Sequence, residues 1–390
     1  MRVLVAHNLY RSATPSGENQ LVRAEIELLR TGGVEVVELL RDSDEIAGGL
    51  RGALQAAPGP IRSPGGVRRF TRLLAEARPD VVHLHNVYPL ISPAVIPVAR
   101  RHGVPVVQTV HNYRHGCVNG LHLRDGHVCT DCLGTRLGLP GIEHGCYRGS
   151  PLQTVPMTLG QDLHRRTWRR GVDRFLALTP FMRDHLVRTG IPRDRIIVRP
   201  TWVPDPGLAG APGRDVLYVG RLDEAKGIDR LLDAWAMRGS ETGRTLTVVG
   251  DGPLRGRVEE AVGTGAVRWL GQVPPAEVAA AIGSAAYVVV PSRVFEGYPL
   301  VVAEAFGRGR PVLTVSRGSV GTIVSDATGW VVDPTVEALA AAIARITDDD
   351  ARSRGAAART SYEQHNTPEQ GFAGLVAIYD EVAEGSRGSH

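Results

Sequence analysis

Short apolar runs alternate with longer amphipathic stretches along most of the chain. The runs are rich in Val, Leu and Ile and lack polar alternation, so they predict strands that are buried on both faces. We expect strands at Val3–Ala6, Val34–Leu39, Val81–Leu84, Val104–Val110, Arg174–Leu178, Val216–Val219, Leu246–Val249, Val267–Leu270, Tyr287–Val290 and Pro311–Val315. Helical spacing of apolar residues predicts helices at Gln20–Leu29, Pro93–Arg101, Ile228–Ala236, Val301–Phe306, Thr335–Ile346 and Thr367–Glu384. Such alternation is typical of parallel sheets with helices on each side.

The alternation restarts about halfway along the chain, which predicts an α/β protein with two doubly wound, Rossmann-like domains. We place the first domain at residues 1–199 and the second at 214–364, and we expect their sheets to face one another across a cleft. The segment 200–213 is rich in Pro and Gly and predicts a linker. A last helix at 365–384 is expected to cross back to the first domain, and 387–390 resembles the remnant of a tag.

The composition is that of an ordinary folded protein and argues against several classes. Of 390 residues, 43% are apolar and 22% are charged, which disfavours global disorder. The net charge is +4 and the pI is near 9.0, but arginine is spread along the chain and aromatic residues make up only 5%. A nucleic-acid partner is therefore not favoured. No apolar run is long enough to span a membrane, and the start MRVLVAHNLY predicts a strand rather than a signal peptide. We expect a cytoplasmic protein.

The richest chemistry follows a buried strand in the second domain, where a loop with Glu296 and Gly297 leads into a helix that is expected to begin near Pro299. The N–H groups of Tyr298–Val301 and the helix dipole would form a site for an anion or a hydroxyl. Because Glu296 is acidic, it suits hydroxyl groups better than anions. Glu304 lies among small apolar residues, and the two hydroxyls of a ribose would satisfy its carboxylate. The alternative is a helix cap and a solvated glutamate.

Two cations follow another strand of the same domain. Arg221 and Lys226 lie just after the expected strand end at Gly220, where they would suit a diphosphate and neutralise a leaving group without a metal. The alternative is a solvated loop in which Arg221 pairs with Asp223 or Glu224.

In combination these motifs resemble the GT-B family 4 retaining glycosyltransferases. Other stretches that resemble this family in order and spacing are Pro15-Ser16-Gly17-Glu18-Asn19, His83-Leu84-His85-Asn86, Thr109-Val110-His111-Asn112, Val249-Gly250-Asp251-Gly252-Pro253 and Leu270-Gly271-Gln272-Val273. The resemblance covers nearly the whole chain. It implies the GT-B fold and transfer of a sugar from a nucleotide-diphosphate sugar, for which UDP is our best expectation, to a hydroxyl acceptor. The configuration of the sugar would be retained, and catalysis would need no metal.

The resemblance also implies roles for individual residues. It assigns donor binding to Gly17, Arg221, Lys226, Gly297, Tyr298, Pro299, Leu300 and Glu304. Catalytic positions are His111, beside the donor sugar, and Glu296, which holds that sugar. His111 also closes a buried strand, a position where loops often carry chemistry. His83 and His85 share one face of a strand, for which we favour hydrogen bonding over a metal.

All four cysteines lie in one segment that follows His111. Cys117, Cys129, Cys132 and Cys146 give the spacing C-x11-C-x2-C-x13-C, and the central C-x2-C resembles half of a four-cysteine zinc site. A structural zinc is one hypothesis, and disulfides or free thiols are the others. In each case we expect this segment to shape the acceptor side.

Two other functions stay open at this point. A nucleotide-sugar epimerase would use the same donor on a similar scaffold without an alcohol acceptor. A zinc-stabilised nucleic-acid-binding protein would account for the pI and the cysteines, but it would leave Arg221, Lys226, Glu296 and Glu304 unexplained.

Overall fold

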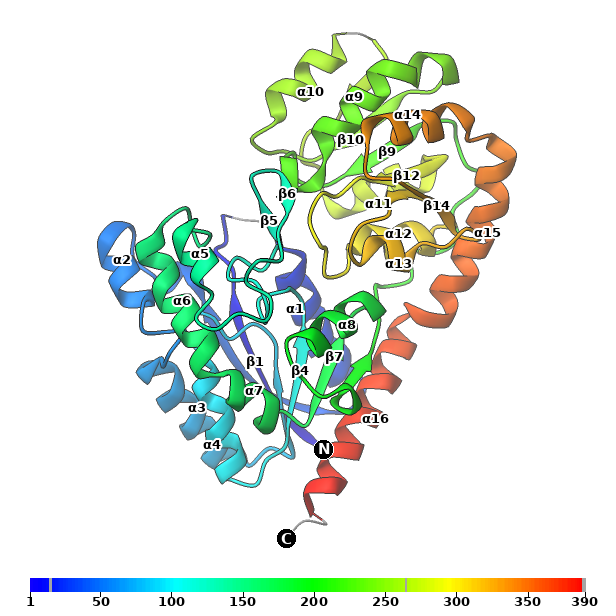
Figure 1. Ribbon diagram of the computed structural model, residues 1–390. Coiled ribbons are helices and arrows are strands. Elements are labelled where there is room, and N and C mark those ends of the chain that lie inside the picture. The colour runs from blue at the N-terminus through cyan, green and yellow to red at the C-terminus, as the bar shows by residue number, and fades with distance from the viewer. Residues whose placement is uncertain (14–15, 264, 388–390) are drawn as a thin grey trace. The chain divides into compact units, whose positions relative to one another are not determined.

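The structure is a computed structural model that describes residues 1–13, 16–263 and 265–387 (Figure 1). Pro15 of the N-terminal glycine motif and residues 388–390 of the expected tag remnant lie outside the described residues. The chain divides into two compact units. Unit 1 comprises Met1–His122, Thr130–Arg199 and the chain from Phe372 onward, and unit 2 comprises Leu123–Cys129 and Pro200–Gly371.

Unit 1 is built on a six-stranded parallel sheet with the strand order β2-β1-β3-β4-β7-β8. Its strands are β1 (Arg2–Leu9), β2 (Glu35–Asp42), β3 (Val81–Leu84), β4 (Val106–Val110), β7 (Arg174–Ala177) and β8 (Ile196–Val198). Its helices are α1 (Gly17–Thr31), α2 (Gly49–Ala56), α3 (Pro64–Ala77), α4 (Ile96–Arg101), α5 (Leu139–Glu143), α6 (Pro151–Leu163), α7 (Arg165–Gly171), α8 (Pro180–Arg188) and most of α16 (Pro368–Arg387). A short hairpin, β5 (Leu123–Arg124) with β6 (His127–Val128), groups with unit 2.

Helix α1 shows how the sequence forms these elements. The Ser16 side chain accepts a hydrogen bond from the backbone N–H of Asn19 and so caps the helix. The buried residues Val22, Glu25, Ile26 and Leu29 follow at helical spacing and form one face. Leu375, Ile378, Tyr379 and Val382 of α16 join the same hydrophobic cluster as α1 and β1. The last helix therefore completes the core of unit 1.

Unit 2 holds a second six-stranded parallel sheet with the order β11-β10-β9-β12-β13-β14. Its strands are β9 (Val216–Val219), β10 (Leu246–Val249), β11 (Val267–Trp269), β12 (Tyr287–Val290), β13 (Val312–Val315) and β14 (Gly329–Val332). Its helices are α9 (Ile228–Arg238), α10 (Arg255–Val262), α11 (Pro275–Ser284), α12 (Leu300–Gly307), α13 (Val320–Ile323), α14 (Val336–Arg345) and α15 (Asp348–His365).

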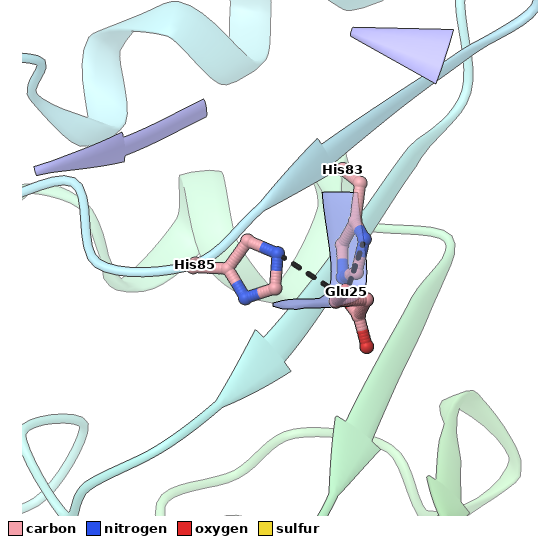
Figure 2. A group of neighbouring side chains, drawn as sticks. All are labelled: Glu25, His83 and His85. Atoms are coloured by element: carbon pink, nitrogen blue, oxygen red, sulfur yellow. Dashed lines mark ion pairs between the residues drawn. The ribbon is translucent and has the colours of Figure 1, made fainter. Parts of the chain in front are cut away.

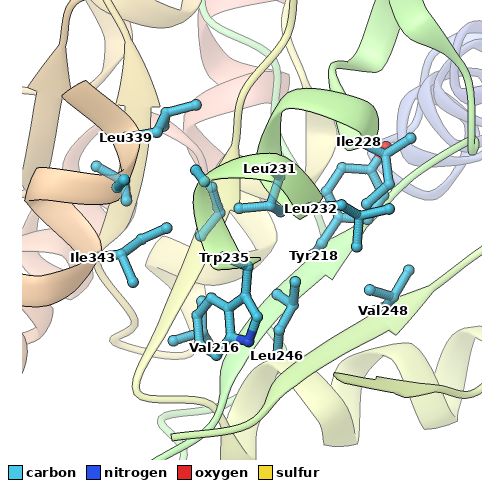
Figure 3. Close-up of a cluster of buried hydrophobic side chains, with 14 of the residues drawn as sticks. Val216, Tyr218, Ile228, Leu231, Leu232, Trp235, Leu246, Val248, Leu339 and Ile343 are labelled. Atoms are coloured by element: carbon cyan, nitrogen blue, oxygen red, sulfur yellow. The ribbon is translucent and has the colours of Figure 1, made fainter. Parts of the chain in front are cut away.

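Both faces of this sheet are covered. Val216 and Tyr218 of β9 pack with Trp235 of α9 and Ile343 of α14 in the cluster of Figure 3. Leu217, between them in sequence, belongs to a second cluster on α12 and α15. Successive residues of a strand point to opposite faces, so β9 is buried on both sides, as its continuous apolar run predicts.

The α/β class with two parallel sheets is confirmed, and each expected strand is present. Strands β8 and β14, the short hairpin and helix α15 were not expected, and helices α2, α3, α5–α8, α10, α11 and α13 are further elements that the sequence analysis did not name. Helix α12 begins at Leu300, so Pro299 occupies the capping position rather than the first helical turn. In the part of the chain that the structure describes, we find no helix with the length and apolar character needed to cross a lipid bilayer.

Candidate functional site

The loops after β9 and β12 are neighbours because these two strands pair at the centre of the unit 2 sheet. The chain places β10 and β11 on one side of β9, and β12, β13 and β14 on the other. Such a change of direction is where doubly wound sheets bind ligands, at the carboxyl ends of the strands. The loop after β9 carries Lys226 and the loop after β12 carries Glu296, so the topology brings the two residues together.

Lys226 and Glu296 form the central ion pair of this site. Lys226 Nζ lies 2.7 Å from Glu296 Oε1 and 2.9 Å from Oε2, and Ser292 Oγ donates a hydrogen bond of 2.7 Å to Oε1. The Glu296 side chain is 11% exposed and that of Lys226 is 35% exposed, so the pair lies at the protein surface with the ammonium partly in solvent. Lys226 is the only lysine in the sequence. The chain thus uses its one compact, strongly hydrated cation at this position.

Gly227 allows the two loops to approach so closely. Its backbone has a φ of +73°, and a Cβ at this position would lie 2.1 Å from the carbonyl oxygen of Pro291. Only glycine adopts this conformation at low cost and leaves room for that carbonyl. The backbone N–H of Arg293 also donates a hydrogen bond of 2.8 Å to the carbonyl of Ala225. The two loops therefore hold one another in place beside Lys226.

Arg221 pairs with Asp223 in its own loop, as in the alternative reading of this motif. Its side chain is 55% exposed. The Tyr218 hydroxyl donates a hydrogen bond of 2.8 Å to the backbone carbonyl of Arg221, so the backbone is fixed while the guanidinium remains at the surface. Arg221 is thus not part of the Lys226–Glu296 pair.

The remaining donor-site residues expected in unit 2 lie on helix α12 or just before it. Glu304 is largely enclosed, and burial raises the pKa of its carboxyl above the ordinary value. Tyr298 lies just before the helix, and its hydroxyl accepts a hydrogen bond of 2.9 Å from Asn366 Nδ2. The Tyr298 hydroxyl is therefore engaged within unit 2.

His111 lies in unit 1, directly after β4, and lines a cavity of about 310 Å³. Because β3 and β4 pair, His85 at the end of β3 lies next to it, and His85 Nδ1 is 2.9 Å from His111 Nε2. Burial lowers the pKa of His111 to about 3, so its ring is neutral at neutral pH. A neutral imidazole carries a proton on only one of its two nitrogens. Other residues that line the cavity are Glu18, Asn86, Tyr88, Gln108, Asn112, Arg114, Gln161, Arg165 and Trp168.

A buried polar network lies beneath His111 and was not predicted. Glu25 of α1 is 5% exposed, and its Oε2 lies 3.0 Å from Arg199 Nη1. Its Oε1 lies 3.6 Å from His83 Nδ1 and 3.5 Å from His85 Nε2, and Figure 2 shows both rings beside this carboxylate. The Tyr379 hydroxyl of α16 is 2.6 Å from His83 Nδ1. The one feature of the sequence that could have indicated this network is Glu25, which lies on the apolar face of α1.

Three groups of this network could by themselves hold a metal ion, since the ligand atoms of Glu25, His83 and His85 lie within 4.8 Å of one another. Their hydrogen bonds favour another role. His83 Nε2 is 2.8 Å from Thr109 Oγ1, so both nitrogens of this ring have partners. A cation would also lie beside the buried guanidinium of Arg199, which it would repel. These contacts support the hydrogen-bonding role that we expect for His83 and His85.

Glu18 is a second, half-buried acid to which the sequence analysis gave no role. It lines the same cavity, and Tyr10 donates a hydrogen bond of 3.2 Å to its Oε2. Burial raises the pKa of Glu18 to about 7, although the charge of Arg114 opposes this shift. Gly17, the neighbouring position expected near the donor, is the first residue of α1 and is exposed.

The cysteine segment folds around Gly141 in unit 1. Cys132 Sγ would lie 3.3 Å from a Cβ at Gly141, and Val118, next to Cys117, would lie 3.0 Å from it. The backbone N–H of Cys146 donates a hydrogen bond of 2.9 Å to the Gly141 carbonyl. Cys129 groups with unit 2, so a four-cysteine zinc site stays a prediction. Cys132 lines the cavity beside His111.

Two family models match the chain. The model for the glycosyl transferase 4-like domain matches residues 16–202, and the model for glycosyl transferases group 1 matches residues 213–349. Together with the two parallel sheets, these matches show that the chain belongs to the GT-B, family 4-type glycosyltransferases.

Individual relatives are similar over part or all of the chain. The O-antigen chain mannosyltransferase B of Escherichia coli is 27% identical over 223 residues, which are 50% of this chain and 58% of that protein. This chain thus spans little more than half of that relative. Anabaena HepE, solved in complex with UDP, has a TM-score of 0.67 at 14% identity and covers 98% of this chain and 100% of its own. A sucrose-phosphate synthase from Thermosynechococcus elongatus has a TM-score of 0.70 at 22% identity, over 97% and 98% of the two chains. These structures share the fold.

Proposed function

We propose that the protein is a retaining glycosyltransferase that moves a sugar from a nucleotide-diphosphate sugar, with UDP as the best candidate nucleotide, to a hydroxyl acceptor. The observation that carries this proposal is the Lys226–Glu296 pair at the central strand ends of the unit 2 sheet. Family membership supports the reaction class, and the UDP complex of Anabaena HepE supports the nucleotide.

The proposed roles in unit 2 follow from charge and burial. The Lys226 ammonium would bind the diphosphate and neutralise the charge that develops on the leaving group. Glu296 would then accept hydrogen bonds from the sugar hydroxyls, and Glu304 would accept them from the ribose. Arg221 would have to leave Asp223 to reach a phosphate, and its exposed side chain makes this exchange inexpensive.

Unit 1 would bind the acceptor in the cavity that His111 lines. In the proposed reaction the bond between the anomeric carbon and the diphosphate oxygen breaks, and the acceptor oxygen bonds to the same face of the sugar. The acceptor proton goes to the departing diphosphate. Because no step of this scheme requires a metal, we propose that chelation with EDTA leaves the rate unchanged.

Calorimetry with UDP, GDP and dTDP tests the nucleotide, and product analysis with a panel of nucleotide sugars tests the reaction. We expect one nucleotide to bind most tightly and the product to keep the anomeric configuration of the donor, which NMR coupling constants report. A product with inverted configuration contradicts the retaining mechanism. Release of nucleotide without a glycoside, in the presence of many alcohols, indicates the epimerase class instead.

A further inference from the structure

The hydrogen bond between His85 and His111 has a direction that the surrounding charges decide. At neutral pH neither ring is charged, since burial lowers the pKa of His111 to about 3 and that of His85 well below its ordinary value. In a 2.9 Å contact between two neutral imidazoles, one nitrogen must carry the proton and the other must accept it. The two ring planes lie within 23° of each other, which suits an in-plane lone pair. Whichever ring donates fixes which nitrogen of His111 remains basic.

Glu25 and Arg199 supply the charge that decides this direction. Both are almost fully buried, and their 3.0 Å contact is that of an ion pair. Burial raises the pKa of the Glu25 carboxyl above its ordinary value, and the Arg199 guanidinium opposes this shift. We infer that the carboxylate is ionised, because its contact with Arg199 is that of a buried ion pair.

The free oxygen of that carboxylate then faces His85. Glu25 Oε1 and His85 Nε2 are both buried and lie 3.5 Å apart, and neither has a hydrogen-bond partner among the residues that the structure describes. An ionised carboxylate oxygen only accepts hydrogen bonds. It therefore stabilises the form of His85 that carries its proton on Nε2, and this leaves His85 Nδ1 with a lone pair.

We propose that Glu25 acts through His85 as a positioning residue for His111. With a lone pair on His85 Nδ1, His111 must donate through Nε2, so its Nδ1 is left as the hydrogen-bond acceptor of a side chain that lines the cavity. This arrangement, carboxylate to imidazole to imidazole, extends the common use of a carboxylate to fix the tautomer of a histidine. It concerns unit 1 alone. Only the consequence for catalysis rests on the proposed function.

The other groups around the network do not reverse this direction. Tyr379 and Thr109 both bond to His83, not to His85. His7 lies with its ring centroid 6.0 Å from that of His85, and its Nδ1 accepts a hydrogen bond from the backbone N–H of Asn86. The proton of His7 is therefore on Nε2, which makes this residue an internal reference for the same tautomer.

Nitrogen NMR of protein labelled with 15N-histidine tests the proposal without any substrate. A His111→Asn variant assigns the His111 signals among the thirteen histidines. We expect Nδ1 of His111 to show the chemical shift of an unprotonated nitrogen and Nε2 that of a protonated one, as for His7. A proton on Nδ1 of His111 overturns the proposal, because it requires His85 to donate.

Variants then test whether Glu25 is the cause. Glu25→Gln alone removes the carboxylate beside the buried charge of Arg199 and is expected to destabilise the fold, so the double variant Glu25→Gln with Arg199→Met removes both charges together. In this variant we expect the 15N chemical shifts of His111 to show that the proton is no longer confined to Nε2. Glu27→Gln is the matched control, an exposed glutamate on the same helix. An unchanged His111 tautomer in the folded double variant contradicts a positioning role for Glu25.

Kinetics separate this inference from the proposed function. If His111 acts in transfer, the double variant should lower kcat by about 10–100-fold, as is common when the partner of a functional histidine is removed, with KM for the donor little changed. If the tautomer responds to Glu25 but kcat does not, then the catalytic role of His111 fails, while the positioning by Glu25 stands.

Discussion

Replacement of Lys226 by alanine is the sharpest test of the donor site. Lys226 contributes an ammonium that contacts both oxygens of Glu296 at 2.7 and 2.9 Å. Its side chain is 35% exposed, so the ion pair itself contributes only about 0–1 kcal/mol to stability. We expect Lys226→Ala to lower the melting temperature by no more than a few degrees.

The effect on diphosphate binding should be much larger than the effect on stability. A hydrogen bond to a charged group contributes about 1.5–3 kcal/mol, which corresponds to roughly a 10–150-fold change in Kd. The variant also removes the ammonium beside the Glu296 carboxylate, which is 11% exposed, and this negative charge would repel a phosphate. The double variant Lys226→Ala with Glu296→Gln should therefore recover part of the lost affinity, which a double-mutant cycle measures.

Calorimetry with UDP and with uridine distinguishes a phosphate contact from a general loss of the site. We expect Lys226→Ala to weaken UDP and to leave uridine unaffected. Arg238→Ala is the control, since it removes another ion pair of unit 2, between Arg238 and Glu241, whose two side chains are about half exposed. Because Lys226 is the only lysine, an amine-acylating reagent offers a second readout in the intact protein, as UDP should protect this residue. If Lys226→Ala leaves the UDP affinity unchanged and UDP does not slow the acylation of Lys226, the assignment of the diphosphate site is refuted.

Four further outcomes are expected. Glu304→Gln should weaken UDP and uridine by a similar factor, roughly tenfold, in calorimetry, because both ligands carry the ribose. Gly227→Ala should destabilise the protein by about 1–3 kcal/mol in thermal unfolding, since the new Cβ meets the Pro291 carbonyl. If the cysteine segment binds zinc, Cys132→Ser should remove it in elemental analysis, and wild-type protein without metal ends that hypothesis. Because the pKa of Glu18 is raised from 4.5 to about 7 in the folded state, its contribution to stability is present below pH 4.5 and lost as the pH rises to about 7. Relative to wild type, Glu18→Gln should therefore gain up to about 3 kcal/mol over this range in denaturant titrations, and a constant difference contradicts the shift.

The sheets and the donor-site loops could be predicted because their signals are local. A continuous apolar run such as Tyr287–Val290 indicates a strand buried on both faces, and the residues that follow a parallel strand lie at its carboxyl end. The same reasoning missed α15, because its first turn contains Asp348, Asp349 and Asp350 and resembles a solvated connection. In the structure Thr347 caps this helix, and acidic residues in the first turn interact favourably with the helix dipole.

The pairing of Lys226 with Glu296 could not be predicted from either motif alone. The motif around Lys226 and the motif around Glu296 each indicate a loop with charged residues. Taken alone, each charge could equally be exposed to solvent. Their contact depends on β9 and β12 being neighbours, and this follows from the strand order rather than from the local pattern. Once that order is known, the positive φ of Gly227 and its approach to Pro291 explain why the two loops meet.

The buried network of unit 1 could not be predicted for a similar reason, because its residues are far apart in the sequence. Glu25 and Arg199 are 174 residues apart, and Tyr379 is 296 residues from His83. Glutamate on an apolar helix face costs free energy unless a partner is present, so the sequence could indicate that Glu25 has a buried partner but not which residue it is. Arg199 and Tyr379 belong to segments that complete unit 1 late in the chain, directly after β8 and in α16. The Glu25 oxygen that does not contact Arg199 lies 3.5 Å from His85 Nε2, so we infer that this buried charge orients His85 and, through it, His111.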